Sequence, residues 1–116
     1  GLPGTSLDLL LQAEYKIGRC LEKLGNVDDA FEQYYAMVVC VYLDARLKGE
    51  AMSEAAEVWF TRAAFDAAAI MESQGNWRSA LRILQRVVDA GVRAAGDAQK
   101  RIEKIRSEHW VIPLKG

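Results

Sequence analysis

The sequence predicts an all-α fold. Ala, Leu, Glu, Arg and Lys, which are all strong helix formers, dominate the chain. Only 2 of its 116 residues are proline, and apolar residues recur at helical spacing between turns that contain glycine. With 51% apolar and 27% charged residues, the composition is that of a soluble globular domain.

The first two helices are expected on either side of a Gly-Asn turn. The first runs from Ser6 to Leu24, and Gly25 ends it in the left-handed conformation that glycine favours. Asn26 caps the second helix, which has no interruption before Lys48-Gly49. Short connections of this kind place consecutive helices antiparallel.

Three further helices are predicted from similar signals at their ends. The third starts within residues 50–53 and reaches Gln74, and the fourth, capped by Asn76, stops near residues 90–91. A closing helix covers about residues 96–109. The second and third helices are unusually long, at about 22 residues each against an average of about 11.

A short pattern occurs twice, with the second copy fifty residues after the first. Residues 23–35 read KLGNVDDAFEQYY, and residues 73–85 read SQGNWRSALRILQ. Small residues that suit close helix crossings and large residues that fill the space between them fall on equivalent positions. The equivalent pairs are Gly18 with Ala68, Leu21 with Met71, Val27 with Trp77, Ala30 with Ala80, Tyr34 with Leu84, and Met37 with Val87.

This pattern resembles the tetratricopeptide repeat family over residues 12–39 and 62–89. The resemblance implies a single domain over 1–116, with one repeat at about 6–48, a second at about 50–91 and a closing helix at about 96–109, on which Ala98, Ile102 and Ile105 share a face. The family's early Trp position holds Glu14 and Ala64 here, and Tyr42 stands where a proline is usual. An ordinary helical bundle with a chance duplication is the alternative.

The spacing of fifty exceeds the usual period of about 34 residues. The excess corresponds to about two added turns on each of the second and third helices. The added stretches, VVCVYLDARL and AMSEAAEVWF, are rich in apolar residues. We therefore expect them to bury each other and to project as a long hairpin.

No constellation of residues points to catalysis, so a non-enzymatic protein without metal or cofactor is expected. His109 is the one histidine and is expected to be solvated at a helix end, and no glycine-rich phosphate loop occurs. Cys20 and Cys40 are too far apart along a helical hairpin for a disulfide and are expected to be small core residues. No apolar run is long enough to span a membrane.

The resemblance implies a protein or peptide partner bound in a concave groove lined by the first helix of each repeat. Lys16 and Arg19 would hold a carboxylate there, whereas Phe65 and Ala69 indicate a partly apolar ligand such as an amphipathic segment. The Asn that completes the family's carboxylate clamp is missing, so a chaperone tail is not the expected ligand. The groove positions carried over are Gln12, Tyr15, Lys16, Arg19, Glu22, Arg62, Phe65, Asp66, Ala69 and Glu72.

Charge is distributed unevenly along the chain. Residues 1–77 carry 6 Lys or Arg and 12 Asp or Glu, whereas residues 78–116 carry 9 and 4. Arg78, Arg82 and Arg86 recur every four residues and form one stripe. Three interpretations stay open: an acidic partner, a solvated face, or stacking between oppositely charged repeats. Nucleic acid is not expected, because the net charge is −1 and no aromatics interleave the stripe.

The first helix is apolar on two sides, which predicts packing on both. One stripe holds Leu7, Leu10, Ile17 and Leu21, and the other holds Leu9, Ala13, Cys20 and Leu24. We expect either further repeats before the chain's first residue or a homodimer through this helix, so a structural oligomerisation unit is the alternative function. The ending, residues 81–105, is similar to closing repeats of bacterial cell-envelope assembly proteins of the family, whereas unpaired cysteines favour a reducing compartment.

Overall fold

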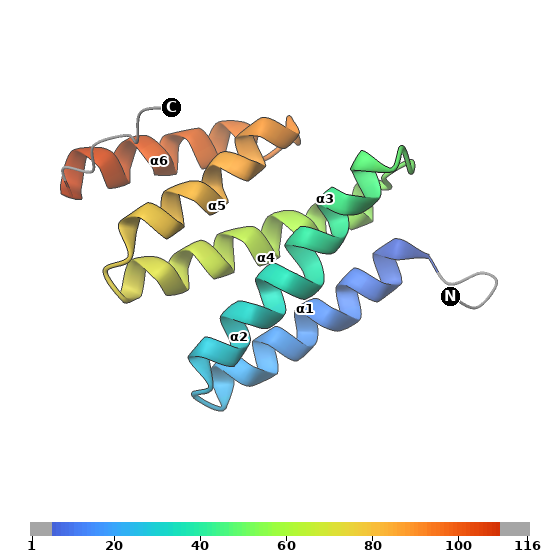
Figure 1. The fold of residues 1–116 in the computed structure, drawn as a ribbon, viewed down its shortest axis with the longest axis horizontal. Helices are drawn as coiled ribbons and strands as arrows, with labels where there is room; N and C mark the ends of the chain where they lie inside the picture. Colours follow the sequence, from blue (N-terminus) through green and yellow to red (C-terminus); the bar gives the residue numbers. More distant parts are fainter. Residues whose placement is uncertain (1–5, 110–116) are drawn as a thin grey trace. The chain divides into compact units, whose positions relative to one another are not determined.

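The computed structural model describes residues 6–109, and all secondary structure in that range is helical, as predicted. One long helix is continuous through α2, η1 and α3, so five helices are present over these residues. The elements are α1 (Leu7–Lys23), α2 (Val27–Tyr34), the π-helical segment η1 (Tyr35–Val39), α3 (Cys40–Leu47), α4 (Glu54–Ser73), α5 (Trp77–Ala90) and α6 (Ala95–His109) (Figure 1).

The chain folds as two compact units whose boundary lies within α4. The first unit ends at Ala67 and contains α1, α2, η1, α3 and the beginning of α4. The second unit begins at Ala68 and contains the end of α4 with α5 and α6. Within the first unit α1 and α2 run antiparallel, and within the second α5 and α6 do the same (Figure 1).

The two Gly-Asn turns have the same backbone structure. Gly25 has φ 82° and Gly75 has φ 72°, both in the left-handed region that favours glycine. The amide of Asn26 donates to the Leu21 carbonyl at 2.9 Å, and the equivalent amide of Asn76 donates to the Met71 carbonyl at 2.8 Å. The duplicated sequence pattern therefore encodes the same helix-to-helix turn twice.

The side chains of the two capping residues differ. Asn76 accepts a hydrogen bond from the Ser79 amide at 3.3 Å. Asn26 is the N-cap residue of α2, as predicted, but its side chain makes no such bond.

Gly18 is a point of close packing between α1 and Tyr34 of α2, as the repeat pattern predicts. A Cβ added at Gly18 would lie 2.4 Å from Cε1 of Tyr34, which is far inside van der Waals contact. Tyr34 and Ala30 are fully buried, and the Tyr34 hydroxyl donates to Glu22 Oε1 at 2.7 Å. A small residue on α1 thus makes room for the tyrosine ring of α2.

The π-helical segment η1 redirects the buried face of the long second helix. A π-helical turn accommodates one more residue than an α-helical turn, and here the two adjacent residues Val38 and Val39 are both buried. Met37, which the repeat comparison paired with the buried Val87, is instead 41% exposed. That prediction was wrong because the pairing assumed an unbroken α-helix.

The added stretch of the second helix contacts α4, as predicted. Tyr42 of α3 stacks on Phe60 of α4 with ring centroids 4.3 Å apart and an interplanar angle of 17°. Both rings are buried, with Ala45 and Ala56 also in the core. The stacked pair shows how these two long helices bury their apolar stretches within the first unit.

In the second unit, α5 and α6 pack through apolar stripes. Ala98, Ile102 and Ile105 of α6 are buried, as the shared face predicts. His109, at the end of α6, is exposed as expected, and its ring stacks on Trp77 of α5 with ring centroids 3.5 Å apart. The buried residues of α5 are Ala80, Leu81, Ile83, Leu84 and Val87.

Helix α1 buries a different face from the ones predicted. Its core residues are Leu11, Tyr15 and Gly18, none of which belongs to either predicted stripe. Cys20 is exposed and Cys40 is half-buried, so the prediction that both are core residues is corrected. The remaining large apolar side chains of α1 are exposed in part: Leu9 by 56%, Leu10 by 44%, Ile17 by 47% and Leu24 by 74%.

Candidate protein-binding site

A cluster of polar and aromatic side chains joins α1 to the first part of α4 within the first unit. The Tyr15 hydroxyl donates to Asp66 Oδ2 at 2.6 Å. The ring of Tyr15 lies between two others, with centroids 5.6 Å from Trp59 and 5.5 Å from Tyr34. Together with those of two arginines, these contacts define the α1–α4 cluster, which consists of Tyr15, Arg19, Trp59, Arg62 and Asp66.

The two arginines of the cluster remain accessible to solvent. Arg19 Nη1 lies 4.0 Å from Asp66 Oδ2, and 50% of the Arg19 side chain is exposed. The Arg62 guanidinium lies 5.2 Å from the ring centroid of Trp59, in a cation–π arrangement. Both cations are therefore held by a neighbour, and both side chains are exposed to solvent.

The electrostatics keep Tyr15 protonated as a hydrogen-bond donor. Burial, and then the hydrogen bond to Asp66, raise the pKa of Tyr15 from 10.0 to about 12. Burial also raises the pKa of Asp66 above 3.8, while the Tyr15 hydrogen bond and Arg19 oppose that rise. The cluster thus contains a half-buried carboxylate whose ionised form is favoured by the Tyr15 hydrogen bond and by the nearby arginines.

The structure brings together four of the predicted groove residues: Tyr15, Arg19, Arg62 and Asp66. Glu22 is next to them, because it accepts the hydrogen bond from Tyr34. The other groove residues of the first unit lie at the surface or partly beneath it. Lys16 is exposed, and Gln12 and Phe65 are half-buried.

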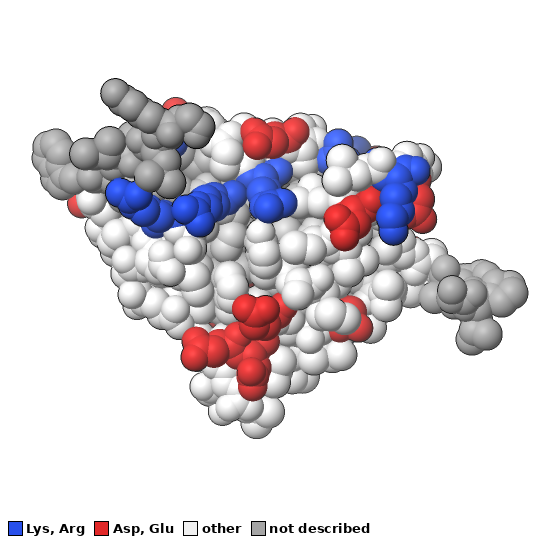
Figure 2. All heavy atoms as spheres, viewed as in Figure 1, with Lys and Arg blue, Asp and Glu red and all other residues white. Residues whose placement is uncertain are grey.

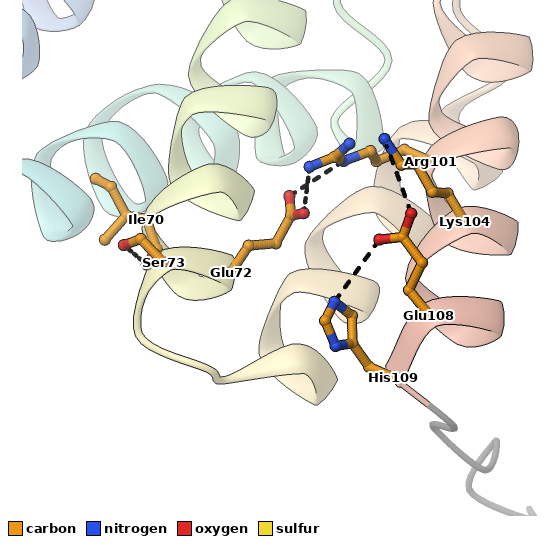
Figure 3. A network of polar contacts seen from close by, with 7 residues as sticks. All are labelled: Ile70, Glu72, Ser73, Arg101, Lys104, Glu108 and His109. Carbon is orange, nitrogen blue, oxygen red and sulfur yellow. Dashed lines mark hydrogen bonds and ion pairs between the residues drawn. The ribbon is translucent and has the colours of Figure 1, made fainter.

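The last two predicted groove residues, Ala69 and Glu72, belong to the second unit. Glu72 points toward α6, where its carboxylate pairs with the Arg101 guanidinium through Nε at 3.3 Å and through Nη2 (Figure 3). Its side chain is 13% exposed. Glu72 therefore has a structural partner within its own unit.

Two members of this neighbourhood, Trp59 and Tyr34, were not among the predicted site residues. Trp59 lies three residues before Arg62 and seven before Asp66, so helical spacing places all three on one face of α4. That spacing is a signal from which Trp59 could have been found. Tyr34 was assigned to the core, and its ring reaches the cluster by packing against Tyr15.

The predicted basic stripe lies on the exposed face of α5. Arg78, Arg82 and Arg86 are all exposed, and Figure 2 shows a row of basic side chains over α5. The fifty-residue offset pairs Arg78 with Asp28 and Arg82 with Glu32 on α2, where Figure 2 shows acidic side chains. Positions of α2 and α5 that are fifty residues apart therefore carry opposite charges.

Residues 6–109 form neither a metal-binding cluster nor a membrane-spanning helix. No three His, Cys, Asp or Glu side chains in this range are placed to hold a metal ion. None of the helices described there is both long and apolar enough to cross a membrane.

Comparison with known proteins identifies the first helix pair. Residues 12–39 match the model of the tetratricopeptide repeat. Searches of curated proteins and of solved structures gave no match. The matched segment begins in α1, crosses the Gly25 turn and ends with the last residue of η1. Residues 12–39 are a tetratricopeptide repeat, a motif that generally mediates protein–protein interaction.

Proposed function

We propose that this protein is a non-enzymatic interaction module whose α1–α4 cluster binds a peptide or helical segment carrying both acidic and apolar side chains. Arg19 and Arg62 would pair with the acidic groups of the ligand. Trp59 and the half-buried Phe65 would contact its apolar groups.

The observation that carries the proposal is the state of Arg19. Its guanidinium is oriented by Asp66 at 4.0 Å, yet half of its side-chain surface is open to solvent. A positioned but accessible arginine loses less conformational entropy on binding a carboxylate than a mobile one does. The neighbouring indole of Trp59 provides the kind of aromatic anchor that dominates binding energy in many interfaces.

A peptide library displayed on phage, selected against the whole chain, tests this proposal. We expect selected peptides to be enriched in Asp or Glu next to Leu, Ile or Phe. Arg62→Ala and Trp59→Ala should each weaken those peptides about tenfold or more, because each removes an anchor from the site. Fluorescence anisotropy with the selected peptides gives the dissociation constants.

Arg78→Ala on α5 is the matched control, since Arg78 is also an exposed arginine but lies in the second unit. It should leave the affinity within about twofold. If instead Arg78→Ala weakens the peptides and Arg62→Ala does not, the ligand site is the basic stripe of α5 and the proposal is wrong.

A further inference from the structure

The outward face of α1 carries the residue spacing of a coiled coil. Leu10, Ala13, Ile17, Cys20 and Leu24 follow one another at intervals of three, four, three and four residues. That alternation is the heptad spacing that places apolar residues in one seam against a second helix. All five are exposed, and they lie opposite the buried face formed by Leu11, Tyr15 and Gly18.

The residues of this seam would allow one partner helix to pack closely against α1. The larger residues Leu10, Ile17 and Leu24 occupy one heptad position, and the small residues Ala13 and Cys20 occupy the other. Small residues at alternate layers let a partner helix approach closely and place its own large side chains over them. A continuous apolar stripe of this length on a helix surface is a mark of an interaction site.

One edge of the seam is positively charged. Lys16, Arg19 and Lys23 recur at helical spacing along it and are exposed. Three of the six Lys and Arg residues in residues 1–67 lie on this edge, although the same residues include 11 Asp or Glu. Within residues 6–109, no carboxylate pairs with Lys16 or Lys23.

The opposite edge of the seam is already used inside the first unit. Glu14 and Leu21 lie there, and both are half-buried. The backbone carbonyl of Glu14 accepts from Gln33 Nε2 at 3.1 Å, and its carboxylate accepts from the same amide group. The charge that a partner helix meets is therefore that of the lysine edge.

A second copy of α1 does not complement this edge. In an antiparallel pair, the lysine edges of the two helices would face each other and repel. In a parallel pair, Lys16 would face Leu21 of the other copy and would gain no ionic partner. The complementary occupant is instead a helix with the same apolar spacing and with acidic residues along the facing edge.

We infer that the outward face of α1 is a docking site for an amphipathic helix of another protein, with acidic residues along one edge. The apolar seam is separate from the α1–α4 cluster, because Leu10, Ile17 and Leu24 project from the side of α1 opposite Tyr15. Arg19 is the one residue named in both surfaces, so the docking contacts assigned here are those of the seam, Lys16 and Lys23. The partner helix buries its apolar residues on the seam and places its carboxylates against Lys16 and Lys23.

Two synthetic peptides test the inference with the whole chain. Both are three-heptad helices with identical leucine and alanine seams, and one carries Glu at the edge positions where the other carries Lys. We expect the Glu peptide to bind about tenfold or more tightly than the Lys peptide. Raising the salt from about 50 mM to about 500 mM should reduce that difference.

Variants assign the binding to this face. Ile17→Asp should abolish binding of the Glu peptide and leave the circular dichroism spectrum unchanged, because Ile17 is 47% exposed. The double variant Lys16→Glu, Lys23→Glu should reverse the preference between the two peptides. Arg62→Ala, which removes an anchor of the α1–α4 cluster, should not change the affinity for either peptide.

Three results would overturn the inference. These are equal affinity for the two peptides, no binding of either, and unchanged binding by Ile17→Asp. Sedimentation velocity of the chain alone gives a further check. A dimer that Ile17→Asp dissociates, and that forms at concentrations below the dissociation constant of the Glu peptide, would assign the face to a second copy of this chain instead.

Discussion

The Tyr15 hydroxyl donates to Asp66 Oδ2 at 2.6 Å and so joins two residues that lie 51 positions apart in the sequence. Asp66 is half-buried, and burial raises its pKa. The hydrogen bond opposes that rise, because it stabilises the ionised carboxylate. This single contact therefore supports both the packing of α1 on α4 and the charge of the candidate site.

Tyr15→Phe should lower the free energy of unfolding by about 1–2 kcal/mol, because it leaves a half-buried carboxylate oxygen without its donor. Urea denaturation measures the change. Asp66→Asn keeps an acceptor but removes the charge, and the double variant completes a thermodynamic cycle. We expect a coupling energy of about 1 kcal/mol between the two positions. Strictly additive effects would show that the hydrogen bond contributes nothing to stability.

Gly18→Ala should destabilise the first unit by about 1–3 kcal/mol, because the new methyl group overlaps the buried ring of Tyr34. The ring has little room to move, since Glu22 holds its hydroxyl. Gly96→Ala on α6 is the matched control, because no atom lies within 4 Å of the added Cβ. That change should be neutral or stabilise the protein by up to about 1 kcal/mol. Equal effects of the two variants on thermal unfolding would contradict close packing at Gly18.

Stability should fall as the pH rises above 10. The pKa of Tyr15 is about 12 in the folded protein and 10.0 without its surroundings, so the unfolded chain loses this proton first. Ionisation of the unfolded chain favours unfolding between those two values. Unfolding free energies measured across this range should decline, and the decline should be smaller in Tyr15→Phe. It should not vanish, because burial also raises the pKa of Tyr34. An unchanged decline in Tyr15→Phe would count against a perturbed Tyr15.

Arg101→Ala should destabilise the second unit by about 1 kcal/mol or more, because it leaves the Glu72 carboxylate, whose side chain is 13% exposed, without its partner. Lys104→Ala is the control. Lys104 pairs with Glu108 at 4.0 Å, but both side chains are more than half exposed. Such surface pairs contribute little, so the control should change the free energy of unfolding by less than about 0.5 kcal/mol. Both variants should bind the peptides of the α1–α4 cluster with the same affinity as the original protein.

The helix boundaries could be predicted from the sequence because Gly25, Gly75 and Gly91 mark three of them. Glycine adopts the positive φ that ends a helix more readily than other residues do. All three have positive φ in the structure. The buried face of α1 could not be found in the same way. The buried face of α1 contains a glycine and a tyrosine, whereas most of the leucines of that helix lie outside this face.

The candidate site was predictable only in part. Family resemblance placed Tyr15, Arg19, Arg62 and Asp66 on the facing helices, and the structure brings them together. The family resemblance also placed Glu72 in the binding groove, but its partner Arg101 lies on the closing helix. Which carboxylate meets a partner inside the protein depends on long-range packing, and no spacing along the chain encodes that.

The π-helical segment η1 makes the second helix tolerant of a change in its length. One surplus residue in η1 lets Tyr34 before it and Tyr42 after it share the buried side of one continuous helix. Deleting a single residue between Tyr35 and Val39 would turn the segment into an ordinary α-helix and keep both tyrosines facing inward. A deletion at most other buried helical positions would rotate everything beyond it by about 100° and expose the core. The second helix can thus lose one residue in this stretch and keep its buried side.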